Sequence, residues 1–172
     1  AKDDYKNLPN VIDFNKHKSV MDVGGSYGAL LETIQNSNRA IQCVLFDLEK
    51  VIEKVKIQNI EKVAGSFFNS VPSQSDAIIL SRILHDWNDN NAKKILENCF
   101  KALPNIGKLY IIENCSDKIK VDLSLLSLNM TVMCESYERT SIEYISLAEN
   151  VGFQFESEIQ LNELQTILIL KV

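Results

Sequence analysis

The sequence has 172 residues, of which 45% are hydrophobic and 24% are charged, as in soluble globular domains and unlike disordered or collagen-like chains. It carries 18 basic and 23 acidic residues, a net charge of −5 without a basic block, which argues against a nucleic-acid-binding surface. Apolar runs such as Ala77–Leu80 are too short to cross a bilayer, and the first residues resemble neither a signal nor a transit peptide. We expect a single cytoplasmic domain over residues 1–172, with neither nucleic acid nor membrane as a partner.

Cysteine and histidine usage gives no sign of a metal site. The two histidines, His17 and His85, are too few for a His-rich cluster. The cysteines form no CxxC pair, and three of them sit inside apolar patterns, where a free cysteine behaves as a small hydrophobe. We therefore expect reduced cysteines, no disulfide framework and no bound metal. The cysteines are Cys43, Cys99, Cys115 and Cys134.

Short apolar runs alternate with helical periodicity along most of the chain. The runs are rich in β-branched residues and read as buried strands at Ser19–Val23, Ile41–Leu48, Lys62–Ala64, Ala77–Ser81 and Lys108–Glu113. Helical patterns lie between them at Ala29–Ile34, Lys50–Ile57 and Ala92–Leu103. Such alternation predicts a parallel sheet that is covered by helices on both faces.

The last third of the chain has a different pattern. Val121–Met133 reads as a helix with apolar residues nearly all round, and Thr140 and Glu143 form a capping box that starts another helix. Gly152 suits the position just after that second helix. An antiparallel pair of strands is expected to close the domain at Phe153–Ile159 and Leu164–Lys171. The whole pattern predicts one doubly wound α/β domain.

Three of the six glycines cluster in VMDVGGSYG, between the first predicted strand and the first helix. At that junction Gly24, Gly25 and Gly28 would let a nucleotide cofactor approach the backbone. The alternative is a tight turn without a ligand. A dinucleotide fingerprint GxGxxG would need glycine at Val23, whereas the carboxylate of Asp22 can hold a cationic amino-acid group.

Asp47 ends the second predicted strand, where an acid can accept hydrogen bonds from ribose hydroxyls. Both NAD and S-adenosyl-L-methionine (SAM) carry a ribose, so Asp47 alone does not choose between them. It could also be a solvated charge at a strand end.

Six motifs together decide the choice of cofactor. They are DVGGSYG, FDL, VAGSFF, LSRILHDWND, the glutamate that ends YIIE, and SLNMTVMCESYERT. In order and spacing, from about Val20 to Phe153, the chain resembles the SAM-dependent O-methyltransferases of the acetylserotonin and caffeic-acid type and their bacterial small-molecule relatives. The resemblance implies a class I methyltransferase fold, a Rossmann-like and mostly parallel seven-stranded sheet with an antiparallel last strand.

The resemblance also implies a role for particular residues. Cofactor-binding positions are Gly24, Asp47, Ser66, Phe67 and Arg82, and Trp87 would lie beside the adenine. His85 matches the family's general base, and Glu113 and Glu138 match the two acids that flank it. Histidine suits this role because it is largely neutral and basic at physiological pH. The acceptor would be a hydroxyl of a small, aromatic molecule.

Plainer roles exist for several of these residues. His85 could be a capping or surface residue, and Glu113 an ordinary acid at a strand end. Glu138 could pair with Arg139, and Asp89 is expected to be the N-cap of the helix that follows it.

The sequence also departs from the family pattern. Ser26 and Ser66 stand where the family usually has Gly and Asp, and the family's N-terminal helical dimerisation domain is absent from this sequence. We therefore expect either a homodimer or a missing N-terminal domain. The competing hypothesis is a catalytically weak or silent methyltransferase-like domain that serves binding or assembly. An NAD-dependent oxidoreductase is disfavoured by Val23.

Overall fold

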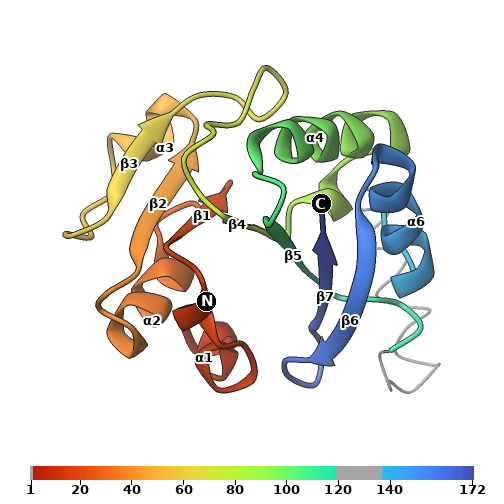
Figure 1. Cartoon of the computed structure of the whole chain (residues 1–172), viewed down its shortest axis with the longest axis horizontal. Helices are drawn as coiled ribbons and strands as arrows, with labels where there is room; N and C mark the ends of the chain where they lie inside the picture. Colours follow the sequence, from red (N-terminus) through yellow and green to blue (C-terminus); the bar gives the residue numbers. More distant parts are fainter. Residues whose placement is uncertain (1, 119–136) are drawn as a thin grey trace, which may run out of the picture.

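A computed structural model describes residues 2–118 and 137–172, which build a seven-stranded sheet with helices on both faces (Figure 1). The strand order is β3-β2-β1-β4-β5-β7-β6. The strands are β1 (Ser19–Val23), β2 (Gln42–Asp47), β3 (Glu61–Ala64), β4 (Ala77–Ser81), β5 (Lys108–Glu113), β6 (Gln154–Gln160) and β7 (Thr166–Lys171). The first five are parallel to one another, whereas β7 is antiparallel to both β5 and β6.

Helices and short 3₁₀ turns connect these strands. The α-helices are α1 (Leu8–Val11), α2 (Ala29–Ser37), α3 (Glu49–Ile52), α4 (Asp89–Ala102) and α6 (Ser141–Val151). The 3₁₀ helices are η1 (Lys2–Tyr5), η2 (Phe14–Lys16) and η3 (Leu84–Asp86). In the described part of the chain no helix has the length and apolar character that crossing a bilayer requires.

Two hydrophobic cores lie on the two faces of the sheet. Successive side chains of a strand point to opposite faces, so Met21 and Val23 of β1 join the core beneath α4 and α6. Val20 of the same strand joins the second core, together with Leu8 of α1 and Leu30 of α2. Every residue of β1 is buried, as expected for a parallel strand that is covered on both faces.

The predicted doubly wound sheet is confirmed, and most predicted elements are found within a residue or two. Ser19–Val23, Ala77–Ser81 and Lys108–Glu113 have the predicted bounds. The closing antiparallel pair is also present, as β6 and β7. The helix predicted at Val121–Met133 lies outside the described residues.

The capping box at the start of α6 is confirmed in both directions. The Glu143 backbone N–H donates to Thr140 Oγ1 at 3.2 Å, and the Thr140 N–H donates to Glu143 Oε1 at 3.1 Å. Gly152 follows the helix with a φ of 127°, a conformation that favours glycine over L-residues.

Two helix predictions were wrong in detail. The helix expected at Lys50–Ile57 is only Glu49–Ile52, and Ile57, beyond its end, packs against the core on the α2 side of the sheet. Asp89 is not the N-cap of α4. Asn88 holds that position and accepts a hydrogen bond from the Asn91 N–H at 2.9 Å, which leaves the Asp89 carboxylate available for another partner.

Candidate active site at the carboxyl edge of the sheet

The strand order places the carboxyl ends of β1 and β4 side by side, although the chain visits β2 and β3 between them. This is the switch point at which open α/β sheets leave a crevice for ligands. The segment Gly24–Gly28, here called the glycine loop, leaves β1 at this point, and Arg82 follows β4.

Two glycines at the start of the glycine loop are packed too closely for a side chain. Gly24 has a φ of +72°, and a β-carbon there would stand 2.5 Å from Cδ1 of Ile83. A β-carbon at Gly25 would collide with the carboxylate of Asp22. The backbone at Gly24 and Gly25 therefore carries no side chain beside the crevice, as a close approach of a ligand requires.

Asp22 is the least satisfied acid in this region. Its side chain is 2% exposed, and its Oδ1 has no hydrogen-bond partner among the described residues. Burial raises the pKa of this carboxyl to about 7, and the nearby charge of Asp47 adds to the shift. An unpaired buried carboxylate is costly, so a cationic or donor group of a ligand would complete it.

A cavity of about 370 Å³, here called the glycine-loop cavity, opens onto this carboxylate. Gly24, Ser26 and Arg82 also line it, together with Tyr5 from η1. Glycine-loop residues, an acid and an arginine thus line one cavity.

A second cavity of about 310 Å³, here called the aromatic cavity, lies beyond the end of β2. Phe67, Phe68 and Trp87 line it, and the Phe68 and Trp87 rings meet edge to face at 4.7 Å between centroids. Ser66 also lines it, and the Ser66 Oγ accepts a hydrogen bond from the Phe68 N–H at 3.3 Å. Such a lining suits a flat ring with some polar edge.

Asp47 lies between the two cavities. One carboxylate oxygen accepts from the Ser26 N–H at 2.9 Å, and the other accepts from the Leu48 N–H at 2.7 Å. Ser26 belongs to the glycine-loop cavity and Leu48 to the aromatic one. Because a carboxylate has about four acceptor sites, Asp47 can still accept from hydroxyls of a ligand that spans both cavities.

His85 stands on η3, close to the end of β5. Its Nδ1 lies 3.3 Å from Oε2 of Glu113, and the His85 backbone N–H donates to Oε1 of the same carboxylate at 3.3 Å. Glu113 is fully buried, and Arg82 Nη1 donates to its Oε2 at 3.0 Å. The second ring nitrogen of His85, Nε2, lies 3.0 Å from Oδ1 of Asp86.

Arg139 fastens the loop that carries His85. Its guanidinium donates to the carbonyl of Leu84 at 2.9 Å and to that of Trp87 at 2.7 Å, and it pairs with Asp89 at 2.8 Å. This side chain is almost completely buried. The Tyr137 N–H also donates to the His85 carbonyl at 2.7 Å, so Tyr137 and Arg139 both bind this loop.

The structure brings most of the predicted site residues together. Gly24 and Arg82 line one cavity, Asp47, Ser66 and Phe67 line the other, and His85 contacts Glu113. Glu138 is the exception.

The Glu138 side chain is exposed and forms no hydrogen bond or ion pair with His85, Glu113 or Arg139 among residues 2–118 and 137–172. Asp89 is the carboxylate that pairs with Arg139. The flanking role of Glu138 stays a prediction. Sequence reasoning missed Tyr5, Asp86 at Nε2 of His85, and the clamp at Arg139, although HDW and ERT were recognised as motifs.

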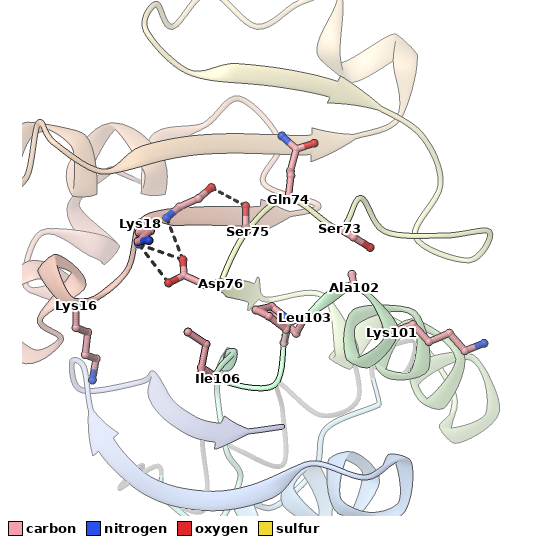
Figure 2. Close-up of a pocket in the computed structure, with 12 residues that line it drawn as sticks. Lys16, Lys18, Ser73, Gln74, Ser75, Asp76, Lys101, Ala102, Leu103 and Ile106 are labelled. Atoms are coloured by element: carbon pink, nitrogen blue, oxygen red, sulfur yellow. Dashed lines mark hydrogen bonds between the residues drawn. The ribbon is translucent and has the colours of Figure 1, made fainter.

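A larger cavity of about 580 Å³, here called the amino-edge cavity, lies at the opposite edge, where β1 and β4 begin (Figure 2). Asp76 there accepts from the backbone N–H of Ser19 at 2.9 Å and from that of Lys18 at 3.2 Å. The Ser19 and Ser75 hydroxyls bond each other at 2.8 Å. None of the described residues that line this cavity has a buried side-chain polar atom without a partner.

Comparison with known proteins identifies the family of the chain. A family model described as an O-methyltransferase domain matches residues 5–154. The chain is 39% identical over 150 residues to cephaeline 6'-O-methyltransferase of Carapichea ipecacuanha, which covers 81% of the chain and 43% of that protein. It is 33% identical over 173 residues to O-methyltransferase 7 of Dictyostelium discoideum, covering 95% of the chain and 51% of that protein.

The fold is similar to a crystal structure of human N-acetylserotonin methyltransferase in complex with SAM. The TM-score is 0.82 at 25% sequence identity, over 99% of this chain and 51% of that one. The chain thus spans about half the length of these relatives. The fold expected from the resemblance is confirmed.

Proposed function

The chain belongs to the O-methyltransferase domain family, and on that premise we propose that it transfers a methyl group from SAM to a hydroxyl of a small, aromatic molecule. The observation that carries the proposal is the buried carboxylate of Asp22 in the glycine-loop cavity, whose Oδ1 has no hydrogen-bond partner among the described residues, with the aromatic cavity on the other side of Asp47.

The residues of both cavities fit SAM. The Oδ1 of Asp22 needs a donor, and the methionyl ammonium of SAM is one. Gly24 leaves the backbone open beside it, and Asp47 has acceptor capacity for ribose hydroxyls. Ser66 and Phe67, with Trp87, offer a polar edge and aromatic faces to an adenine. Arg82, which follows β4, would also bind SAM.

SAM, when bound, supplies a methyl group already activated by its sulfonium, so the acceptor needs alignment and the loss of a proton. His85 is the proposed general base. Glu113 can accept the Nδ1–H of His85, which leaves Nε2 as the basic nitrogen, and it would stabilise the imidazolium that forms. Arg82 holds the same carboxylate in place.

Asp86 affects this mechanism, because its carboxylate contacts Nε2 of His85, the nitrogen that would take the acceptor's proton. The Asp86 side chain is 61% exposed, so it can turn into solvent when an acceptor binds. We propose that the acceptor hydroxyl displaces Asp86 from Nε2.

A second candidate function is a silent methyltransferase-like domain that binds SAM without turnover. The contact between Asp86 and Nε2 favours it, as does the exposed position of Glu138, because neither helps His85 to act as a base. The two candidates differ in turnover and agree in cofactor binding.

The test begins with calorimetric titration of the chain with SAM, S-adenosylhomocysteine (SAH) and NAD. We expect SAM and SAH to bind and NAD to give no heat; the reverse pattern would refute the proposal. Transfer of a labelled methyl group from SAM to a panel of phenols then separates the two candidates. SAH binding without transfer to any phenol would favour the silent domain.

Three expectations drawn from the sequence go beyond this proposal. A cytoplasmic location, and a homodimer or an N-terminal domain as partner, stay predictions. The single-domain assignment of residues 1–172 has the same standing.

A further inference from the structure

Tyr5 belongs to the glycine-loop cavity but has no part in the function proposed above. It ends η1, which packs beside α2 near the amino terminus (Figure 1). The Tyr5 hydroxyl lies 2.8 Å from Oγ of Ser81, which ends β4. This contact joins residues 76 positions apart in the sequence.

The hydrogen bond between the Tyr5 and Ser81 hydroxyls leaves one of their two protons undonated. Each carries one proton, and a single hydrogen bond between them uses only one of the two. Either oxygen can be the donor, so one O–H remains to be donated to a third group. Burial raises the pKa of Tyr5, and the acids Asp22 and Asp4 add to the shift against the opposing effects of Ser81 and Arg82, so the phenol keeps its proton at neutral pH.

The surrounding charges indicate what that third group is. Asp22 lines the glycine-loop cavity as an acid, and Tyr5, Ser81 and Arg82 line the same cavity as donor residues. An acid and a set of donors around one cavity complement a zwitterion, whose ammonium binds the acid and whose carboxylate binds the donors. The amino-acid end of SAM is such a zwitterion.

We propose that Tyr5 is a cofactor-binding residue, whose ring walls the glycine-loop cavity and whose hydroxyl, shared with Ser81, binds the carboxylate at the amino-acid end of SAM. This inference rests on the proposed function, because it assumes that SAM occupies the cavity.

A purely structural role for Tyr5 predicts a different outcome. If the contact with Ser81 only ties η1 to the sheet, losing it would lower stability and leave ligand affinity unchanged. Tyr110 provides a matched control, because its hydroxyl also makes one side-chain hydrogen bond, to Nε2 of His17 at 2.7 Å, at the opposite edge of the sheet.

The experiment is titration of the full chain and its variants with SAH and with methylthioadenosine, which lacks the amino-acid end. In Tyr5→Phe we expect SAH to bind about 10-fold more weakly, as for one lost hydrogen bond to a charged group, and methylthioadenosine to bind as before. Ser81→Ala, which breaks the pair from the other side, is expected to act in the same direction. Tyr110→Phe should change neither affinity.

The possible outcomes distinguish a failure of the role of Tyr5 from a failure of the proposed function. Unchanged SAH affinity in Tyr5→Phe, or equal weakening of SAH and methylthioadenosine, would overturn the role of Tyr5 while leaving the methyltransferase proposal intact. Absence of SAH binding in the unmodified chain would instead overturn the proposed function itself.

Discussion

Asp22 lies near the carboxyl end of β1 and Asp76 beside its amino end, and the pKa values of the two carboxyls shift in opposite directions. Burial dominates at Asp22 and raises its pKa to about 7. At Asp76 burial acts in the same direction, but backbone N–H groups of Ser19 and Lys18 and the charge of His17 outweigh it and lower the pKa. Protein groups at the amino edge therefore stabilise the Asp76 carboxylate, whereas the Asp22 carboxylate at the carboxyl edge stays available to a ligand.

Two of the three described non-glycine residues with a positive φ lie at the carboxyl edge, and the third is Asn59, away from the site. Ser26 and Arg82, both at the carboxyl edge, have φ values of 56°, in the left-handed region that L-residues avoid. Such conformations persist where the surrounding structure forces them, and they cluster at functional sites. Cavity size alone is thus a poor guide to function here, since the larger cavity lies at the amino edge, where Asp76 already accepts hydrogen bonds from the protein.

The strongest way to test the difference between the edges is to remove one histidine from each. If His85 is the base, His85→Ala should lower methyl transfer by roughly 10²–10⁴-fold, the usual contribution of general-base catalysis, with little change in SAH affinity. His17→Ala is the control. It leaves the Tyr110 hydroxyl unpaired, which should cost about 1–3 kcal/mol of stability and spare the turnover of the folded protein. Near-normal turnover in His85→Ala would remove this residue from the mechanism.

Changing Arg139, which binds the His85 loop, should have the next largest effect on turnover. Arg139→Lys cannot reproduce three directions of hydrogen bonding, so η3 should shift and turnover should fall by up to about 10²-fold. SAH affinity should change much less, which calorimetry on the same samples would verify. An equal loss of both would show that Arg139 supports the whole domain rather than this loop.

Asp22 predicts a pH dependence of opposite sign to that of Asp76. A carboxyl with an ordinary pKa of 3.8 and a folded value of about 7 binds more protons when folded, so its contribution to stability is full at low pH and is lost as pH rises toward 7. Asp76, with its lowered pKa, contributes stability above its ordinary pKa that is lost as pH falls through the lowered value.

The same ionisation should govern ligand binding. SAH affinity should rise as Asp22 loses its proton near pH 7, and Asp22→Asn should weaken it by about 10–100-fold and flatten that pH dependence. Titrations between pH 6 and pH 8 would measure this, with Asp76→Asn as the matched variant that keeps the wild-type profile. A pH-independent wild-type affinity would contradict the role of Asp22.

Ser66 offers a smaller gain-of-function test. Ser66→Asp places a charged acceptor in the aromatic cavity, where it should tighten SAH binding by about 10-fold through a charge-assisted bond to an adenine amino group. Ser73→Asp makes the same change at the amino-edge cavity and should have no effect on SAH. Weaker binding in Ser66→Asp would show that the cavity has adapted to serine.

The smallest expected effect concerns strain in the glycine loop. Ser26→Gly should relieve the left-handed backbone and raise thermal stability by up to about 1 kcal/mol, part of it offset by the greater freedom of unfolded glycine. Asn59→Gly, at a φ of 65° away from the site, is the comparison. SAH affinity should stay near the wild-type value, since the amide that donates to Asp47 is kept; a clear loss would make the Ser26 side chain a ligand contact.

Much of the fold could be predicted because burial follows local periodicity. The strands β1, β4 and β5 are apolar runs with the bounds that the sequence indicates, and the capping box and Gly152 mark both ends of α6. The glycine cluster, Asp47 and the HDW motif likewise placed most of the site at one edge, because the carboxyl ends of parallel strands converge there.

What the sequence determined by itself was the local pattern: strands, caps and the motifs that follow them. Only the tertiary structure decided the pairings across the site: Tyr5 with Ser81, Asp86 with His85, and Arg139 with the carbonyls beside His85. It also decided that Asp22 Oδ1 has no hydrogen-bond partner within residues 2–118 and 137–172, while Asp76 accepts from two backbone N–H groups. Such contacts depend on the order of the strands in the sheet and on side-chain rotamers. Neither the strand order nor a rotamer can be deduced from the periodicity of the sequence.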